Sequence, residues 1–269
     1  MEKKYVLSKE TYLLKDIYDE RGCCALSIGD EEHSARYYDN TLVHRVVYTK
    51  EIVGKNSEIL ASPGDVGGYV ESEANLSQEG DCVVLNNAVV LDKAVVKDNA
   101  IVAGNALVFC DAVVKNDARV LERAIVFDDV QVSDKAVVKG CAVVKEKASV
   151  FNNGVVDGIT EISGNAFVCG NAQVFNFARV TDKASVSGDA QVCGLAIIMN
   201  NAQINSKAVV TGKAKITGNA KITNEAKICG NAQVGKNSIV GGKLVVGNDA
   251  VVADNNMYIK ENDFNVKTK

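Results

Sequence analysis

Between Ala88 and Val252 the sequence repeats every six residues without an insertion. Each repeat carries a small residue, one intervening residue, and then Val or Ile. The third slot is Val or Ile in all 28 consecutive repeats, and the small slot is Ala in 23 of them. A period of six fits neither an α-helix nor a heptad. The two-residue alternation within each repeat predicts a short strand that turns the small and branched residues to one side.

The residues between these short strands are mostly Gly, Asn, Asp or Lys, as in Gly104-Asn105 and Gly218-Asn219. Gly, Asn and Asp adopt turn and left-handed conformations at little cost. A chain that forms a short strand, bends and repeats in fixed register coils into a solenoid. The sequence therefore predicts an all-β fold, a single-stranded parallel β-solenoid over residues 81–253.

The repeats over residues 82–252 resemble the hexapeptide-repeat left-handed β-helix of the trimeric acyltransferase-like superfamily. This resemblance implies a left-handed coil with three sides, so that 28 repeats make about nine coils and a rod roughly 45 Å long. One departure is that Gly or Asp directly follows the aliphatic residue in that family, whereas here such residues mostly come one or two positions later. The stretch Gly64–Ser72 with Asn75-Leu76-Ser77 also resembles the lead-in of uncharacterised bacterial and phage-borne hexapeptide-repeat proteins, some labelled as acyltransferases.

Residues 1–80 do not follow the full pattern and predict a small α+β cap with a lead-in to the coils. Apolar runs at residues 5–7 and 42–48 predict strands, and residues 11–20 predict a helical turn or two. An open solenoid end exposes backbone groups and apolar interior, which gives a cap a structural purpose. Residues 254–269 break the pattern, with Asn256 and Tyr258 at the small and branched slots, and predict a C-terminal cap that folds over the last coil.

The six-residue phase also extends backwards into the lead-in. Counted back from Ala88, Val70, Leu76 and Cys82 fall in the small slot, whereas Ser72 and Gln78 fall in the branched slot. This assignment predicts a transitional coil with larger residues in its small slot.

Outward residues 18 positions apart lie above one another on a three-sided coil, and one side is unusually apolar. A contiguous apolar patch marks a covered surface. Three covers stay open: the N-terminal cap, a second copy of the chain, or a foreign protein. The candidate interface residues are Leu91, Leu107, Phe109, Ile125 and Phe127 on this side, and Ile159, Phe177 and Leu195 in a corner column that also holds Cys141.

Composition predicts a cytoplasmic protein, with export without a cleaved signal left open, because the net charge is −4 and no apolar run is long enough for a signal peptide or membrane span. The eight cysteines are not spaced to bridge adjacent coils, which favours free thiols.

Lysines are spread around the coil, so no nucleic-acid partner is expected. No cofactor or metal is expected either; a calcium ion at a corner with Asp111, Asp128, Asp129 and Glu146 is a weaker alternative.

Two function classes remain. The first is a non-catalytic solenoid, a scaffold or protein-interaction module that uses its apolar face. The second comes from the resemblance: an acyl-CoA-dependent acyltransferase, whose relatives use a histidine as general base in a cleft between neighbouring rods. From residue 81 onward the sequence has no histidine, and no loop interrupts the repeats. His33 and His44 lie in the predicted cap, so no catalytic residue is assigned, and the non-catalytic class is favoured.

Overall fold

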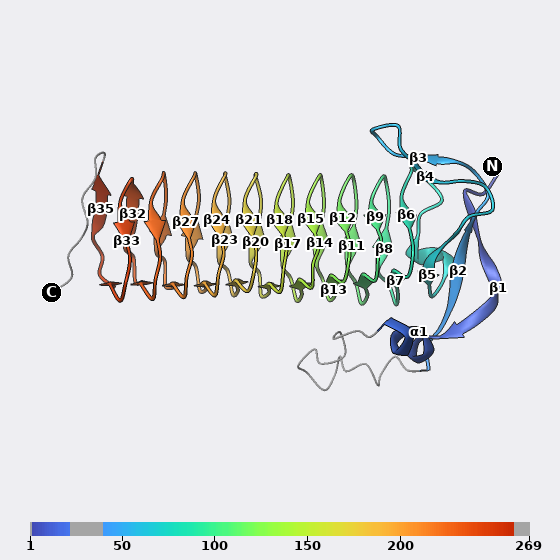
Figure 1. The fold of residues 1–269 in the computed structure, drawn as a ribbon, viewed down its shortest axis with the longest axis horizontal. Coiled ribbons are helices and arrows are strands. Elements are labelled where there is room, and N and C mark those ends of the chain that lie inside the picture. The colour runs from blue at the N-terminus through green and yellow to red at the C-terminus, as the bar shows by residue number, and fades with distance from the viewer. Residues whose placement is uncertain (1, 22–39, 261–269) are drawn as a thin grey trace. The chain divides into compact units, whose positions relative to one another are not determined.

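A computed structural model describes residues 2–21 and 40–260. The chain divides into two compact units, Met1–Asp128 and Asp129–Lys269. Both consist mainly of short parallel strands paired coil on coil (Figure 1), so the predicted parallel β-solenoid is confirmed. The chain makes about 11 turns, more than the nine expected, because the coils begin before Ala88 and continue past Val252.

The first unit combines the cap with the first coils. Strand β1 (Tyr5–Leu13) pairs antiparallel with β2 (Leu42–Tyr48), which pairs antiparallel with β5 (Val66–Val70). Helix α1 (Leu14–Arg21) follows β1, and β3 (Ile52–Val53) pairs with β4 (Ile59–Ala61). The short helix η3 (Glu73–Asn75) leads to the coil strands β6 (Val83–Val84), β7 (Val89–Val90), β8 (Val95–Val96), β9 (Ile101–Val102), β10 (Leu107–Val108), β11 (Val113–Val114), β12 (Arg119–Val120) and β13 (Ile125–Val126).

Over residues 129–260 the second unit consists of coil strands, which belong to three sheets. The first has β16 (Val143–Val144), β19 (Glu161–Ile162), β22 (Arg179–Val180), β25 (Ile197–Ile198), β28 (Lys215–Ile216), β31 (Gln233–Val234) and β34 (Val251–Val252). The second has β14 (Gln131–Val132), β17 (Ser149–Val150), β20 (Phe167–Val168), β23 (Ser185–Val186), β26 (Gln203–Ile204), β29 (Lys221–Ile222), β32 (Ile239–Gly242) and β35 (Met257–Lys260). The third has β15 (Val137–Val138), β18 (Val155–Val156), β21 (Gln173–Val174), β24 (Gln191–Val192), β27 (Val209–Val210), β30 (Lys227–Ile228) and β33 (Val245–Val246).

The coil strands pair in parallel, and each residue lies opposite the one 18 positions away. Leu107, for example, pairs with Val89, and Ile222 with Val240. The branched slot is buried throughout, at 0% exposure in nearly every coil. Burial of one Val or Ile stabilises the fold by roughly 1.5–3 kcal/mol. The small slot is equally buried. Thr160 replaces Ala in this slot, and its buried hydroxyl oxygen has no hydrogen-bond partner among the described residues. This cost explains why Ala dominates the slot.

The bend falls two residues after the branched slot. Every sixth residue from Asn86 to Asn248 has a positive φ, whether it is Gly or a residue such as Asp98 at 61°. At several bends where this residue is Asp or Asn, its side chain accepts from the backbone of the coil that follows. Asp98 Oδ2, for example, accepts from Asn116 N at 2.9 Å, and Asp134 Oδ2 accepts from Asn152 N at 2.9 Å. The predicted turn chemistry is therefore confirmed, and the bend residues also join neighbouring coils.

The lead-in corrects the predicted register. Val70 pairs with Val90, and Leu76 forms a bridge with Val96, so both occupy the branched slot and not the small one. Cys82 does occupy the small slot, because Val83 pairs with Ile101. The spacing from Leu76 to this coil is two residues longer than a repeat, and the extra length forms the loop through Gly80, whose φ is +68°. A strict six-residue count cannot detect such an insertion.

The cap supplies hydrogen-bond donors to the first coil. Within the coils, the C=O groups of Ala100 and Val102 accept from the coil before them. The equivalent groups of Cys82 and Val84 have no earlier coil. Instead, Lys4 Nζ donates to Cys82 O at 3.0 Å, and the Tyr48 hydroxyl donates to Val84 O at 3.0 Å.

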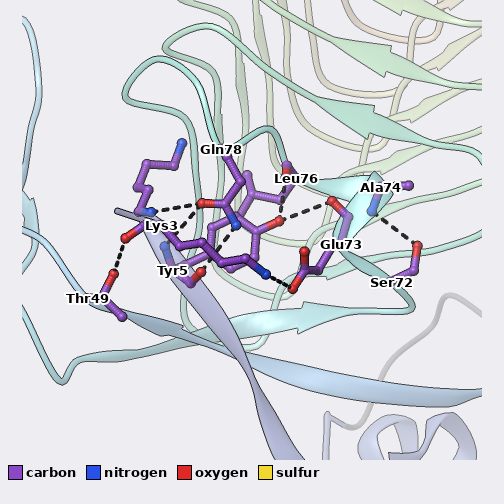
Figure 2. Close-up of polar contacts among 9 residues, drawn as sticks. Lys3, Tyr5, Thr49, Ser72, Glu73, Ala74, Leu76 and Gln78 are labelled. Carbon is purple, nitrogen blue, oxygen red and sulfur yellow. Dashed lines mark hydrogen bonds and ion pairs between the residues drawn. The ribbon is translucent and has the colours of Figure 1, made fainter. Parts of the chain in front are cut away.

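Tyr5 supports the same junction (Figure 2). Its hydroxyl donates to Leu76 O at 2.5 Å, and Glu73 O lies 3.1 Å from the same oxygen. Gln78 Oε1 accepts from Lys4 N at 2.8 Å, and Gln78 Nε2 donates to Tyr5 O at 3.2 Å. The cap is thus joined to the coils by backbone-directed side chains.

The chain continues in coil register beyond Asp254. Strand β35 pairs in parallel with β32, and Tyr258 lies opposite Val240 in the branched slot. Tyr258 donates to the Asp254 carboxylate, and Ser238 Oγ donates to Asp254 O at 3.0 Å. Residues 254–260 therefore add a further strand and do not fold across the last coil; the rest of the predicted C-terminal cap lies outside the described residues.

Candidate interaction surface

The apolar side of the first unit is buried. Leu91, Leu107, Phe109, Ile125 and Phe127 are between 1% and 8% exposed. The rings of Phe109 and Phe127 stack with centroids 4.8 Å apart. Neighbouring coils alone leave an outward valine half-buried, as at Val113. These five residues are thus buried, and their part in an interface stays a prediction.

The corner column of the second unit is exposed. Ile159, Phe177 and Leu195 are 59%, 53% and 50% exposed, and each is 18 residues from the next. Their side chains stand about 4.8 Å apart along the column, which is the spacing of paired strands. Cys141 precedes them in the same column and is half-buried. We call Ile159, Phe177 and Leu195 the apolar column.

Backbone hydrogen bonds hold the apolar column in place. Ile159 N donates to Asn176 O at 2.6 Å, Phe177 N to Gly194 O at 3.0 Å, and Leu195 N to Gly212 O at 2.7 Å. The acceptors are the positive-φ bend residues of the following coils. The four bends in this corner are Gly158, Asn176, Gly194 and Gly212. Because three of them are Gly, few side chains stand beside the column.

Two different surfaces flank the apolar column. On one side a surface hollow is lined by residues that include Val155, Asp157 and Phe175. On the other, Glu161 accepts ion pairs from Lys145 at 3.4 Å and from Arg179 at 2.9 Å. The column therefore has an apolar centre with polar and charged side chains at its rim, which is the usual composition of a protein-binding surface.

The unit that carries the column has no histidine. His44 lies in β2 of the first unit, with Nδ1 3.0 Å from Ser8 O. His33 lies outside the described residues. Burial raises the pKa of the Cys82 and Cys169 thiols, which makes them poor nucleophiles. Six described cysteines are free thiols; Cys23 and Cys24 lie outside the described part.

Within residues 2–21 and 40–260, no three His, Cys, Asp or Glu side chains gather closely enough to hold a metal ion. At the corner considered for calcium, Asp111 lies 3.8 Å from Lys93 Nζ. Across the same residues no helix is long and apolar enough to cross a membrane. No protein-family model matches the chain, and no curated protein matches its sequence.

Proposed function

We propose that the protein is a non-catalytic β-solenoid scaffold that binds a protein partner through the apolar column. The observation that carries the proposal is the column itself: three large apolar side chains, about half exposed, in one straight row. Exposed apolar groups on a regular face indicate a surface that a partner covers. Coil-to-coil hydrogen bonds fix the row, so little ordering entropy opposes binding.

The residues beside the column support binding and not chemistry. A general base needs a pKa near the working pH and access to its substrate. In the coils from residue 81 onward the sequence has no histidine, and His44 lies in the cap with one ring nitrogen at a backbone carbonyl. The alternative is an acyl-CoA-dependent acyltransferase of the hexapeptide class, which requires a cleft between copies of the chain.

The test compares wild-type protein with Phe177→Asp. The matched control is Phe167→Asp, which places the same charge at a 36% exposed phenylalanine on another sheet of the same unit. Light scattering measures self-association, and immobilised protein measures capture of a foreign partner. We expect association to be lost in Phe177→Asp and kept in Phe167→Asp.

Equal association by all three proteins would contradict the proposal. A trimeric mass with saturable coenzyme A binding that His44→Ala abolishes would favour the acyltransferase instead. Both readouts use the intact chain, and hydrogen exchange of coil amides checks that each variant keeps its fold.

A further inference from the structure

The corner position that carries the apolar column is polar at the other two corners of the second unit. At one of them, Asn219 Oδ1 accepts from Asn201 Nδ2 at 2.9 Å, and Asn219 Nδ2 donates to Asn237 Oδ1 at 2.8 Å. Such side chains bond to one another from coil to coil. The apolar column replaces them in three successive coils, although the coils themselves do not require apolar residues at this position.

The row of the apolar column ends on a lysine. Lys213 comes 18 residues after Leu195, and its N–H donates to Gly230 O at 2.7 Å, which is the bond that the apolar residues make to their own following coils. Lys213 is exposed, as is Lys215, two positions further along the chain. Among the described residues no carboxylate pairs with either lysine. The row thus passes from apolar side chains to a pair of ammonium groups that remain available to an anion.

The sheet beside the column carries a second row with the same change of character. Glu161 lies opposite Arg179, and Arg179 lies opposite Ile197. Ile197 in turn lies opposite Lys215. These outward residues therefore run parallel to the apolar column, from an acidic residue at one end to a basic residue at the other.

The two carboxylates that border the column already have cationic partners. Asp157 pairs with Lys139 at 3.3 Å, and Glu161 pairs with Lys145 at 3.4 Å and with Arg179 at 2.9 Å. The surplus charge of this face is therefore positive, although the whole chain carries a net charge of −4. Complementary charge favours an acidic partner.

The spacing of the apolar column favours a helix as its occupant. The column spans about 9.6 Å, because neighbouring coils are about 4.8 Å apart. Apolar residues at i, i+3 and i+7 of a helix span about 10.5 Å, whereas three alternate residues of a strand span about 13 Å. A helix that lies along the rod therefore places one apolar side chain at each residue of the column. Its positions i+10 and i+11 then lie about 15–17 Å from i, near Lys213 at about 14 Å.

We infer that the partner of the apolar column is an acidic amphipathic helix. Its residues at i, i+3 and i+7 are apolar and pack on the column, and its Glu or Asp residues at i+10 and i+11 pair with Lys213 and Lys215. The C-terminal end of the helix lies at these lysines, because that end carries the negative end of the helix dipole. This inference rests on the function proposed above and adds the charge and the secondary structure of the partner.

The probe is a fluorescent alanine-based peptide of about 20 residues, with Leu at i, i+3 and i+7 and Glu at i+10 and i+11. A second peptide carries Gln in place of both Glu residues, which keeps the apolar face and the helix propensity. Fluorescence anisotropy with the full chain should give saturable binding of the Glu peptide. The Gln peptide should bind at least about fivefold more weakly, and this difference should shrink as the salt concentration rises.

The charge contact is tested with the double variant Lys213→Glu, Lys215→Glu. It turns two attractive pairs into repulsive ones and should weaken binding of the Glu peptide by at least about tenfold, with little effect on the Gln peptide. The matched control is Lys207→Glu, Lys221→Glu, which makes the same change in net charge at an exposed lysine of another corner and at one on β29. The control should leave the binding of both peptides unchanged, whereas Phe177→Asp should abolish it.

Equal affinity of the wild type for both peptides, with both lost in Phe177→Asp, would overturn the inference and leave the proposed function standing. Failure of both peptides to bind, while Phe177→Asp still abolishes association in light scattering or partner capture, would have the same meaning. Equal weakening by the two double variants would also overturn it. Co-sedimentation with vesicles of phosphatidylserine and phosphatidylcholine that Lys213→Glu, Lys215→Glu abolishes, without peptide binding, would assign the face to an anionic membrane instead.

Discussion

Lys4→Met should destabilise the junction between the cap and the first coil. Lys4 is 5% exposed, and its ammonium donates to Gly80 O at 3.1 Å, Cys82 O at 3.0 Å and Cys82 Sγ at 3.2 Å. Methionine keeps an unbranched apolar stem of similar length and removes all three donors. The substitution therefore tests the hydrogen bonds with little change in packing.

The expected cost follows from the acceptors that remain. Gly80 is exposed, so water replaces the ammonium at its carbonyl. Cys82 is fully buried, and a hydrogen bond from a charged donor to such a group contributes roughly 1.5–3 kcal/mol. Because methionine also avoids burial of an ammonium, we take the lower half of this range, about 1.5–2 kcal/mol. That corresponds to a roughly 10- to 30-fold larger equilibrium constant for local opening.

Hydrogen exchange measures this opening at the Thr49 amide, which donates to Lys4 O at 3.0 Å. Lys3→Met is the control: the adjacent lysine forms an ion pair with Glu73 at 2.6 Å, but both side chains are about half exposed. Such a pair contributes below about 1 kcal/mol. Equal acceleration by the two variants, or none by Lys4→Met, would refute the role assigned to the buried ammonium.

Three further changes test other parts of the fold. Phe109→Ala should cost about 3–5 kcal/mol because the ring is buried, whereas Phe177→Ala should cost below about 1 kcal/mol; exchange of neighbouring coil amides measures both. Burial raises the pKa of Tyr48, so the neutral Tyr48 hydroxyl contributes its full stability below about pH 10, and this contribution is lost as the pH rises further. Alkaline unfolding followed by phenolate absorbance should therefore show a smaller absorbance step in Tyr48→Phe than in the wild type. The hydrogen bond from Tyr258 lowers the pKa of Asp254, so the ionised carboxylate stabilises β35 above about pH 4, and this stabilisation is lost as the pH falls through the lowered pKa. Hydrogen exchange of the β35 amides should therefore accelerate at acid pH in the wild type and lose this acid dependence in Asp254→Asn.

The coils were predictable from sequence because one rule acts at every repeat. The interior takes a β-branched residue in one slot of every repeat and mostly Ala in the other, and a polar residue there can leave a buried atom without a partner, as Thr160 does among the described residues. The lead-in was not predictable in the same way. The loop at Gly80 lengthens the coil by two residues without disturbing the apolar alternation, so Val70 and Leu76 satisfy either slot when only their hydrophobicity is considered.

For the candidate interface, the repeat does not predict which residues are exposed. The six-residue period places Phe109 and Phe177 correctly as outward residues in apolar columns, yet one is 2% and the other 53% exposed. This difference in exposure does not follow from the repeat, which places both residues outward in the same way. Sequence can therefore assign a residue to a side of a solenoid without telling whether that side is free.

Backbone polarity at the coil edges is the part of the surface that the repeat does determine. Carbonyl groups at the edge of the first coil require donors, and a buried lysine and two tyrosines of the cap provide them. The edge of the last coil presents N–H groups and requires acceptors. A lysine-based cap cannot satisfy that edge, whereas the carbonyl groups of an added strand can, as β35 does for β32. Each edge nevertheless presents both kinds of group: at the first coil the Tyr48 hydroxyl donates to Val84 O at 3.0 Å and accepts from Val84 N at 2.9 Å, so one side chain satisfies a donor and an acceptor.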